Sequence, residues 1–410
     1  TSSERRNPPP TFPSRGRLVL PLPLTEQPYF IKGDNFMYNI LTLNKIAACG
    51  TDRFDGKYSC SDSCENPTAV MVRSASMHET TFAPETLAIA RAGAGTNNIP
   101  VDKCAEQGIV VFNTPGANAN AVKELVICGL LLASRKVTAA YDWCKGLKGE
   151  GDNVGKLVEK GKSQFAGPEI MGKTLGVIGL GAIGFKVAQA AEALGMKIVG
   201  YDPFLSEGVK AALSADTEIV EDINDIFKKS DYITIHVPLN DATKDTVNKD
   251  TLALCKDGVR ILNFARGGLV NSADMIAALE SGKAAAYVTD FPSDEVIGVD
   301  GVIAIPHLGA STPESEDNCA VMAADELIAY IEKGEIVNSV NMPRMPLDKV
   351  DGARTCVIHK ADAADAVKAV LGADAKSAVR GAYGYSVVDS EADAAALEAI
   401  DGVIRVRVIK

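Results

Sequence analysis

Aromatic residues, histidines and long apolar runs are all scarce in this sequence. Aromatics make up 6% of the 410 residues, and only four histidines and one tryptophan occur. No apolar run approaches the roughly 18 residues of a membrane-spanning helix, so we expect no membrane partner. The formal net charge of −11 leaves no basic surplus to neutralise phosphates, so we expect no nucleic-acid partner. A hydrophobic content of 46% with 36 glycines is typical of an α/β enzyme.

The cysteines form no recognisable metal motif. Nine are scattered along the chain, and only Cys60 and Cys64 resemble a pair. Neither a second pair nor a histidine follows at the spacing of a zinc site, so we predict no metal. Reduced thiols used as small apolar residues are typical of the cytoplasm, where we place the protein.

The first 36 residues differ in composition from the rest. They contain seven prolines and show no helical or strand period. Such a composition predicts a disordered extension, with the folded chain beginning at Met37.

Two series of apolar segments alternate with segments of helical length. The first runs from Met37 to about residue 115, and a long apolar helix follows at 119–136. The second begins at Lys173, and a final segment, 351–410, has a strand–helix–strand rhythm of its own. Apolar runs that alternate with helices predict parallel sheets covered on both faces.

The segment "TLGVIGLGAIG" carries the pattern G-x-G-x-x-G at Gly179, Gly181 and Gly184. The pattern alone is a weak signal, but here it follows an apolar strand and opens an alanine-rich helix. The first glycine permits a tight turn, the second lets the backbone approach a pyrophosphate, and the third lets the helix pack on the strand. Free N–H groups at the start of the helix favour phosphates. We therefore predict a dinucleotide site.

Asp202 indicates which dinucleotide binds. It ends the next strand, in "IVGYDP", where a carboxylate can accept hydrogen bonds from both ribose hydroxyls. The same carboxylate would repel a 2′-phosphate. NAD is therefore favoured over NADP.

Polar residues stand at the ends of the later strands. Arg266, Asp290 and His307 each follow an apolar run, and the carboxyl ends of parallel strands share one edge of a sheet. Oxidation of a secondary alcohol needs a base for the hydroxyl proton, and histidine titrates in the right range. Glu295 lies twelve residues before His307, in the connecting loop, and could orient its ring. Arg266 could hold a substrate carboxylate through its planar fork.

The segments "NFARGG", "VTDFPSDE" and "IPHLGAST" resemble the D-isomer-specific 2-hydroxyacid dehydrogenases over Met37 to about Pro343. The resemblance implies that Arg266 binds the substrate carboxylate, Glu295 partners the histidine and His307 is the acid/base. It also implies NAD contacts in addition to the glycine motif and Asp202. These are Ala182, Ile183, His236, Pro238, Phe264, Ala265, Arg266, Asp290, His307, Leu308, Gly309 and Ala310. One departure concerns the proline that usually follows the catalytic glutamate, which is Val296 here. Asp294 is therefore a minor rival of Glu295.

The resemblance also implies the fold. We expect a Rossmann-type, doubly wound NAD domain at 121–309, inserted in a flavodoxin-like substrate domain of residues 37–120 and 310–343. A small C-terminal α+β domain at 351–410 resembles a degenerate ACT regulatory domain. The family further implies a homodimer or higher homo-oligomer, joined through the NAD domain and the long helix.

The choice of substrate depends on the first domain. Gly93, Ala94 and Gly95 supply backbone N–H groups that could hold a carboxylate. Arg73 matches an arginine that points at the substrate phosphate in family members acting on 3-phospho-D-glycerate, although it could equally be a surface cation. A second arginine, common two residues later, is Ala75 here, and Lys156 could replace the lost charge.

We therefore expect NAD-dependent oxidation of 3-phosphoglycerate to 3-phosphohydroxypyruvate, the entry to serine synthesis. A hydroxypyruvate or glyoxylate reductase is the alternative that Ala75 keeps open. A non-catalytic NADH-sensing corepressor on the same fold is a third, which the intact Arg-Glu-His set disfavours.

The remaining histidines have weaker claims to function. We expect His236 to pack near the adenine or to cap its strand, and His78 to be a surface group. His359 ends a strand of the C-terminal segment, where the family holds an effector amino acid. The residues that follow it, from Lys360 to Ala363, offer neither the family's amide nor its turn. We therefore expect no serine site there, and we expect the stretch between Gly372 and Gly381 to be too short for a full second strand.

Overall fold

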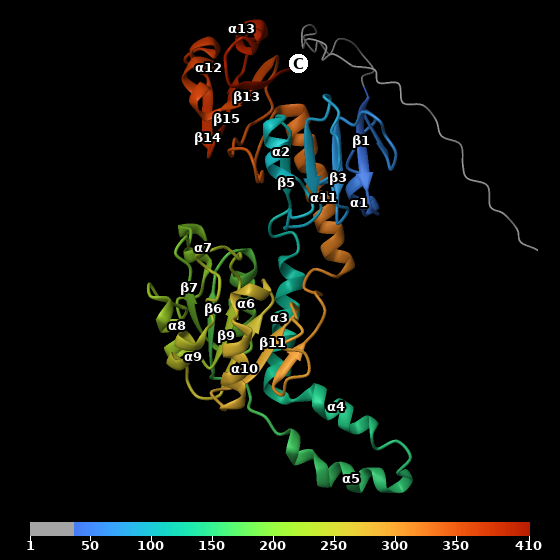
Figure 1. Ribbon diagram of the computed structural model, residues 1–410, viewed down its shortest axis with the longest axis vertical. Helices are drawn as coiled ribbons and strands as arrows, with labels where there is room; N and C mark the ends of the chain where they lie inside the picture. Colours follow the sequence, from blue (N-terminus) through green and yellow to red (C-terminus); the bar gives the residue numbers. More distant parts are fainter. Residues whose placement is uncertain (1–36) are drawn as a thin grey trace, which may run out of the picture.

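The computed structural model describes residues 37–410, which form three separate sheets arranged along an elongated molecule (Figure 1). The extension predicted to be disordered lies outside the described residues. No helix within residues 37–410 combines the length and apolar character needed to cross a membrane.

The first sheet contains five parallel strands in the order β2-β1-β3-β4-β5. This 2-1-3-4-5 order is the one found in flavodoxin-like folds. The strands are β1 (Tyr38–Leu43), β2 (Tyr58–Ser61), β3 (Ala69–Val72), β4 (Ala88–Arg91) and β5 (Val110–Asn113), with the short helices α1 (Ala48–Thr51) and α2 (Val101–Glu106). Strand β3 is buried along its whole length, as expected for a strand covered on both faces.

The second sheet contains seven parallel strands in the order β12-β11-β10-β9-β6-β7-β8. Numbered from β6, this is the doubly wound order 3-2-1-4-5-6 with one more strand at the far edge. The strands are β6 (Thr174–Ile178), β7 (Lys197–Tyr201), β8 (Glu218–Ile219), β9 (Tyr232–Ile235), β10 (Val259–Asn263), β11 (Ala284–Thr289) and β12 (Val302–Ala304). The covering helices are α6 (Ala182–Ala193), α7 (Glu207–Ala212), α8 (Ile223–Lys229), α9 (Lys249–Leu254) and α10 (Ser272–Glu280). The predicted Rossmann-type arrangement is confirmed.

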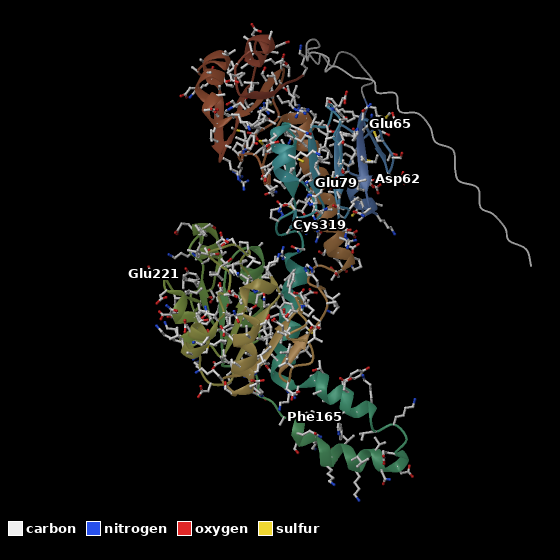
Figure 2. The ribbon with its side chains drawn as sticks, in the orientation of Figure 1. Asp62, Glu65, Glu79, Phe165, Glu221 and Cys319 are labelled. Carbon is white, nitrogen blue, oxygen red and sulfur yellow. The ribbon has the colours of Figure 1, made fainter. Side chains whose placement is uncertain are left out.

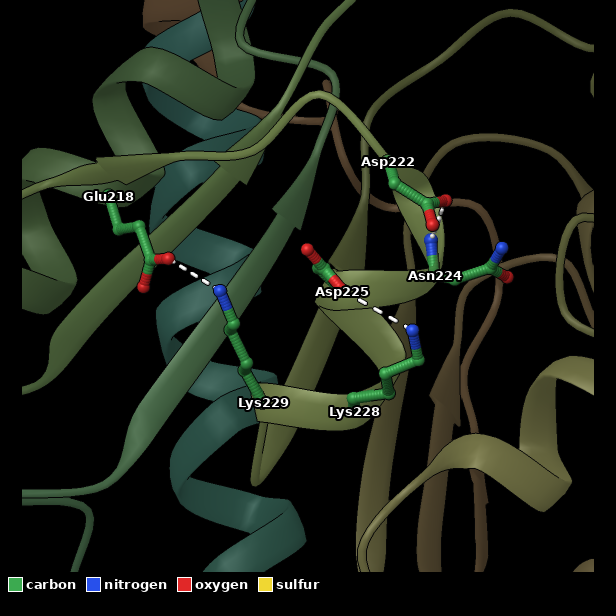
Figure 3. A network of polar contacts seen from close by, with 6 residues as sticks. All are labelled: Glu218, Asp222, Asn224, Asp225, Lys228 and Lys229. Carbon is green, nitrogen blue, oxygen red and sulfur yellow. Dashed lines mark hydrogen bonds and ion pairs between the residues drawn. The ribbon is translucent and has the colours of Figure 1, made fainter.

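Helix α8 shows how local sequence fixes one of these covering helices (Figure 3). Asp222 caps its start, where Oδ1 accepts a hydrogen bond from the N–H of Asn224 at 2.9 Å. Its last turn carries Lys228 and Lys229, which are favourable at the negative end of the helix dipole. Lys229 pairs with Glu218, so the helix is tied to the edge strand β8.

Two long helices connect the two large sheets. Helix α3 (Ala119–Arg135) follows β5 and packs on α6 and β11. It is the long apolar helix predicted at 119–136. Helix α11 (Pro313–Lys333) follows β12 and returns the chain to the first sheet. Its start is set by the Thr312 side chain, which accepts from the N–H of Ser315, and by proline at its first position.

We call the units built on the five-stranded and the seven-stranded sheets the first and the second lobe. An arm projects from the second lobe at the end of α3 (Figure 1). It consists of α4 (Val137–Lys145) and α5 (Val154–Gly161), and neither helix buries a side chain. The arm is closed on itself by Trp143, whose ring lies 5.5 Å from that of Phe165, labelled in Figure 2.

The C-terminal sheet is antiparallel, in the order β14-β15-β13-β16. Its elements follow the pattern βαββαβ. They are β13 (Arg354–Lys360), α12 (Ala364–Leu371), β14 (Lys376–Arg380), β15 (Tyr383–Val388), α13 (Ala394–Glu398) and β16 (Val403–Ile409). The expectation that the stretch between Gly372 and Gly381 is too short for a strand was wrong. Five residues suffice there because every one of them, Lys376 to Arg380, pairs with β15.

The C-terminal sheet is packed against the end of α11. Arg407 donates to the carbonyls of Tyr330 and Ile331, and Arg354 donates to that of Lys333. These carbonyls end the helix, where cationic side chains are favourable. One apolar cluster runs from the first sheet through α11 into β13 and β15. The C-terminal unit is therefore bound firmly to the first lobe.

His359 is fully buried in this unit. Its Nδ1 lies 2.7 Å from the carbonyl oxygen of Lys360, and its Nε2 lies 2.8 Å from Oγ of Ser386. Burial lowers the pKa of the ring. Both nitrogens are therefore engaged inside the protein.

Candidate active site

The glycine motif forms the turn between β6 and α6. Gly179 has φ of +90°, and a Cβ there would lie 2.7 Å from the carbonyl oxygen of His236. Gly184 approaches the carbonyl of Gly179 so closely that no side chain fits. Gly181 is the N-cap of α6, and no protein atom lies within 4 Å of the position its Cβ would occupy. The turn therefore has the shape that a pyrophosphate needs.

Asp202 follows β7 and ties that strand to the glycine turn. Its Oδ2 accepts from the N–H of Leu180 and its Oδ1 from the N–H of Phe204, each at 2.9 Å. A carboxylate oxygen can accept more than one hydrogen bond, so Asp202 keeps acceptor capacity for hydroxyls.

Asp290 lies at the end of β11 and is 1% exposed. Its Oδ2 accepts from the N–H of Gly309 at 3.1 Å, whereas Oδ1 is buried without a hydrogen-bond partner among residues 37–410. Burial raises the pKa of Asp290, and the Gly309 N–H and the nearby His307 oppose that rise. A buried acceptor without a donor is costly, so Asp290 is suited to a ligand that brings an N–H group.

Arg266 follows β10 and is exposed at the same edge. Asn263 holds its backbone, because Nδ2 of Asn263 donates to the Arg266 carbonyl at 2.8 Å. The guanidinium lies over the ring of Phe291 and faces Gly95 of the first lobe. No carboxylate within residues 37–410 forms an ion pair with it.

His307 lies next to the same aromatic ring. The ring centroids of His307 and Phe291 are 4.4 Å apart, so His307 and the Arg266 guanidinium both lie close to the Phe291 ring. Glu295 lies in the loop between β11 and β12, exposed, and makes no hydrogen bond with His307 in the described structure. Its neighbour Val296, in place of the family's proline, is buried in the core and anchors this loop.

The other predicted NAD contacts lie around the carboxyl edge of the second sheet, but the side chain of Phe264 is buried there and that of His236 is half-buried. Phe264 is 5% exposed and packs against α3 with the core, so only its backbone is available to a cofactor. Burial lowers the pKa of His236 to about 3, and its Nε2 lies 2.9 Å from Oγ1 of Thr234. Ala182 lies beside Gly116 of the connection from β5 to α3. Ile183 is the second residue of α6. The remaining predicted positions lie on the connections that follow β9, β10 and β12, namely Pro238, Ala265, Leu308, Gly309 and Ala310.

On the first lobe, Arg73 directly follows β3 and pairs with Glu316 in the first turn of α11, at 2.5 Å. The predicted phosphate cation is therefore partly neutralised by the protein itself. Gly93, Ala94 and Gly95 follow β4 and form a loop at the same end of the sheet. Asn113 supports this loop by donating to the carbonyl of Ala94.

Two predicted residues are not part of this arrangement. Lys156 is exposed on α5 in the projecting arm, away from the edge that carries Arg266 and His307 (Figure 1). His78 is exposed, with Nε2 2.9 Å from the carbonyl oxygen of Asn97.

Three neighbours of the site were not predicted from the sequence: Arg91, Asn263 and Phe291. Arg91 ends β4, and its Nε donates to the carbonyl of Arg73 at 3.0 Å. Burial lowers the pKa of Arg91, and the charges of Arg73 and Arg266 lower it further. Asn263 and Phe291 stand directly at strand ends, so the rule that selected Arg266 and Asp290 could have selected them as well.

The residues at this edge fit NAD. The open turn at Gly181 suits the pyrophosphate, Asp202 suits the ribose hydroxyls, and the unpaired oxygen of Asp290 suits an amide N–H. No group of three histidine, cysteine, aspartate or glutamate side chains could hold a metal ion in the part of the chain that the structure describes.

Comparison with known proteins identifies the family. Residues 127–309 match the family described as "D-isomer specific 2-hydroxyacid dehydrogenase, NAD binding domain". A hydroxypyruvate reductase from Thermotoga maritima is 39% identical over 248 residues, which cover 58% of this chain and 76% of that protein. The chain therefore belongs to the D-isomer-specific 2-hydroxyacid dehydrogenase family.

Other relatives carry a different name. A D-3-phosphoglycerate dehydrogenase from Methanocaldococcus jannaschii is 39% identical over 269 residues, which cover 64% of this chain and 49% of that protein. The chain thus spans about half the length of such curated relatives. Among solved structures, an NAD⁺-bound 3-phosphoglycerate dehydrogenase from Entamoeba histolytica matches with a TM-score of 0.58 and 25% identity, covering 75% of this chain and all of that one.

Proposed function

We propose that this protein oxidises 3-phospho-D-glycerate to 3-phosphohydroxypyruvate with NAD, the first step of L-serine synthesis, in the cytoplasm. The observation that carries the proposal is the meeting of Arg266, Asp290 and His307 at one sheet edge, beside the glycine turn. The relatives named D-3-phosphoglycerate dehydrogenase support the choice of substrate.

In the proposed reaction Arg266 binds the substrate carboxylate with its planar fork. No protein carboxylate in residues 37–410 competes for that guanidinium, and stacking on Phe291 limits its movement. The substrate hydroxyl would then lie between Arg266 and His307, which share the Phe291 ring.

His307 serves as the general base in this scheme. It accepts the hydroxyl proton as the carbinol C–H bond breaks and the carbonyl forms. NAD, when bound, accepts the hydride. Asp290 would orient the carboxamide of the cofactor through its unpaired Oδ1. Glu295 would stabilise the imidazolium, which requires its exposed loop to bring the carboxylate to the ring.

A hydroxypyruvate or glyoxylate reductase is the second candidate. Two observations favour it: Arg73 is engaged by Glu316, and Ala75 stands where the family often has another arginine. The Thermotoga maritima relative carries the name hydroxypyruvate reductase.

Initial rates distinguish the two. With NAD, the proposal expects kcat/KM for 3-phosphoglycerate to exceed clearly those for D-glycerate and 2-hydroxyglutarate. A preference for the unphosphorylated acid, together with fast NADH-dependent reduction of hydroxypyruvate, would favour the second candidate.

We also propose three domains: a substrate domain of residues 37–120 and 310–343, an NAD domain of residues 121–309, and an ACT-like domain of residues 351–410. We further propose that the arm supports a homodimer. The arm exposes Val137 and Tyr141, which are 50% and 66% exposed, and a second copy could cover them. Light scattering of Tyr141→Lys should show more monomer than the wild type, and an unchanged mass would contradict the arm's role.

A further inference from the structure

A groove of the first lobe lies apart from the site described above. It is lined by residues of α11, by Phe112 of β5 and by the segment 335–338, and its volume is about 590 Å³. Helix α11 runs along the first sheet here, above the second lobe (Figure 1). Small-molecule sites in proteins commonly measure about 300–1,000 Å³. The groove therefore has room for a small ligand of its own.

The walls of this groove are mostly apolar. They are supplied by Phe112, Val321, Met322, Ile328, Ala329 and Val337. Such walls gain free energy when an apolar group replaces the water against them. A compound that binds here should therefore carry a hydrocarbon part.

Glu326 is the polar group that lacks a partner in this groove. Its side chain is 9% exposed, and its Oε1 accepts from Nδ2 of Asn338 at 2.7 Å. Its Oε2 is buried and has no hydrogen-bond partner within residues 37–410. A buried oxygen that is left unpaired is costly. A compound that brings a donor to Oε2 would remove this cost.

The other charged side chains around the groove already have partners of opposite charge. Asp325 pairs with Arg53, just after α1, at 2.7 Å, and Nζ of Lys333 lies 4.0 Å from Glu335. The lining residue of β5, Phe112, is uncharged. Among the lining carboxylates of the described chain, Glu326 alone has no cation beside it. The charge that the groove lacks is therefore positive.

We propose that this groove binds a small primary ammonium compound with a short hydrocarbon chain, its ammonium held by Oε2 of Glu326. An ammonium is a compact donor that needs only one open oxygen, whereas the guanidinium fork matches a carboxylate with both oxygens open. The amide oxygen of Asn338 offers the ammonium a second acceptor. The inference does not depend on the proposed function, because the groove shares no residue with the dehydrogenase site.

The proton on Glu326 gives this binding a measurable signature. Burial raises the pKa of Glu326 to about 8, the hydrogen bond from Asn338 opposes that rise, and the charge of Asp325 adds to it. Near neutral pH an entering ammonium must therefore displace a proton from the carboxyl. A hexylammonium ion, like lysine, stays charged up to about pH 10. Its affinity should thus rise about 10-fold or more between pH 6.5 and pH 8.5.

The test is calorimetric titration of the full chain with hexylamine and with 1-hexanol, which has the same hydrocarbon chain without the charge. Near pH 8.5, hexylamine should bind about 10- to 100-fold more tightly than hexanol, as expected for a hydrogen bond between charged groups. Near pH 7, titrations in phosphate and in HEPES should show the release of about one proton for each hexylammonium bound.

Three variants separate the charge from the shape of the groove. Glu326→Gln keeps an oxygen for Asn338, so it should bind hexylamine no better than hexanol and release no proton. Ala329→Leu narrows the groove and should weaken both compounds. Asp317→Asn removes an exposed carboxylate of α11 outside the groove and should behave as wild type. Equal affinities of the wild type for the two compounds, no saturable binding of hexylamine at millimolar concentration, or full retention of its affinity in Glu326→Gln would overturn the inference.

Discussion

Glu326, on α11, is the basis of a quantitative stability prediction. It is 9% exposed, its Oε1 accepts from Nδ2 of Asn338 at 2.7 Å, and its Oε2 has no partner within residues 37–410. Burial, and to a smaller extent the charge of Asp325, raises the pKa of Glu326 from 4.5 to about 8. At neutral pH the folded protein therefore holds a proton that the unfolded chain has released.

The sign and size of the effect follow from this difference in pKa. Because the folded state binds the extra proton, the free energy of unfolding falls as pH rises from the unfolded pKa to the folded one. The penalty grows by about 1.4 kcal/mol per pH unit and reaches roughly 3 kcal/mol near pH 7. Glu326→Gln keeps an oxygen for Asn338 and removes the titration. We expect it to stabilise the protein by about 2–3 kcal/mol near pH 7 and hardly at all near pH 4.5.

Urea unfolding of the wild type and of Glu326→Gln, at both pH values, measures this difference. Asp317→Asn is a matched control, since it removes an exposed carboxylate from the same helix. A stabilisation independent of pH, or a loss of stability near neutrality, would refute the reasoning.

The remaining predictions concern the cofactor, the substrate and the effector. Arg266→Lys should lower kcat and raise KM in steady-state assays, because an ammonium cannot form the bidentate contact; unchanged kinetics would remove Arg266 from the site. Asp202→Ala should weaken NAD binding in titrations and reduce discrimination against NADP, and a wild type that already uses both equally would contradict its role. Millimolar serine should leave initial rates largely unchanged, because both ring nitrogens of His359 are engaged within the protein. Strong serine inhibition that disappears in His359→Ala would contradict this.

Much of the fold could be predicted because it depends on local rules. The strand–helix alternation and the glycine turn are short-range features, and the edge rule for parallel strands predicts Arg266, Asp290 and His307 from the sequence alone. The short strand β14 was missed because its pairing with β15 compensates for its length, and single-segment patterns do not contain that pairing.

The substrate side of the site could not be predicted in the same way. Arg91 gains significance only from the approach of Arg73 and Arg266, one of which belongs to a different sheet. Likewise, the engagement of Arg73 by Glu316 joins residues separated by 243 positions in the chain. Lys156 was selected by its charge alone, and its location on the arm depends on how α4 and α5 leave the second lobe.

The kinetics of His307→Ala test the central claim, that the edge carrying Arg266, Asp290 and His307 is the catalytic site. The variant should be assayed for NADH formation from 3-phosphoglycerate and titrated with NADH. We predict a kcat lower by about 10²- to 10⁴-fold, as for the loss of a general base, with NADH affinity close to that of the wild type. Near-normal turnover in this variant would contradict the account.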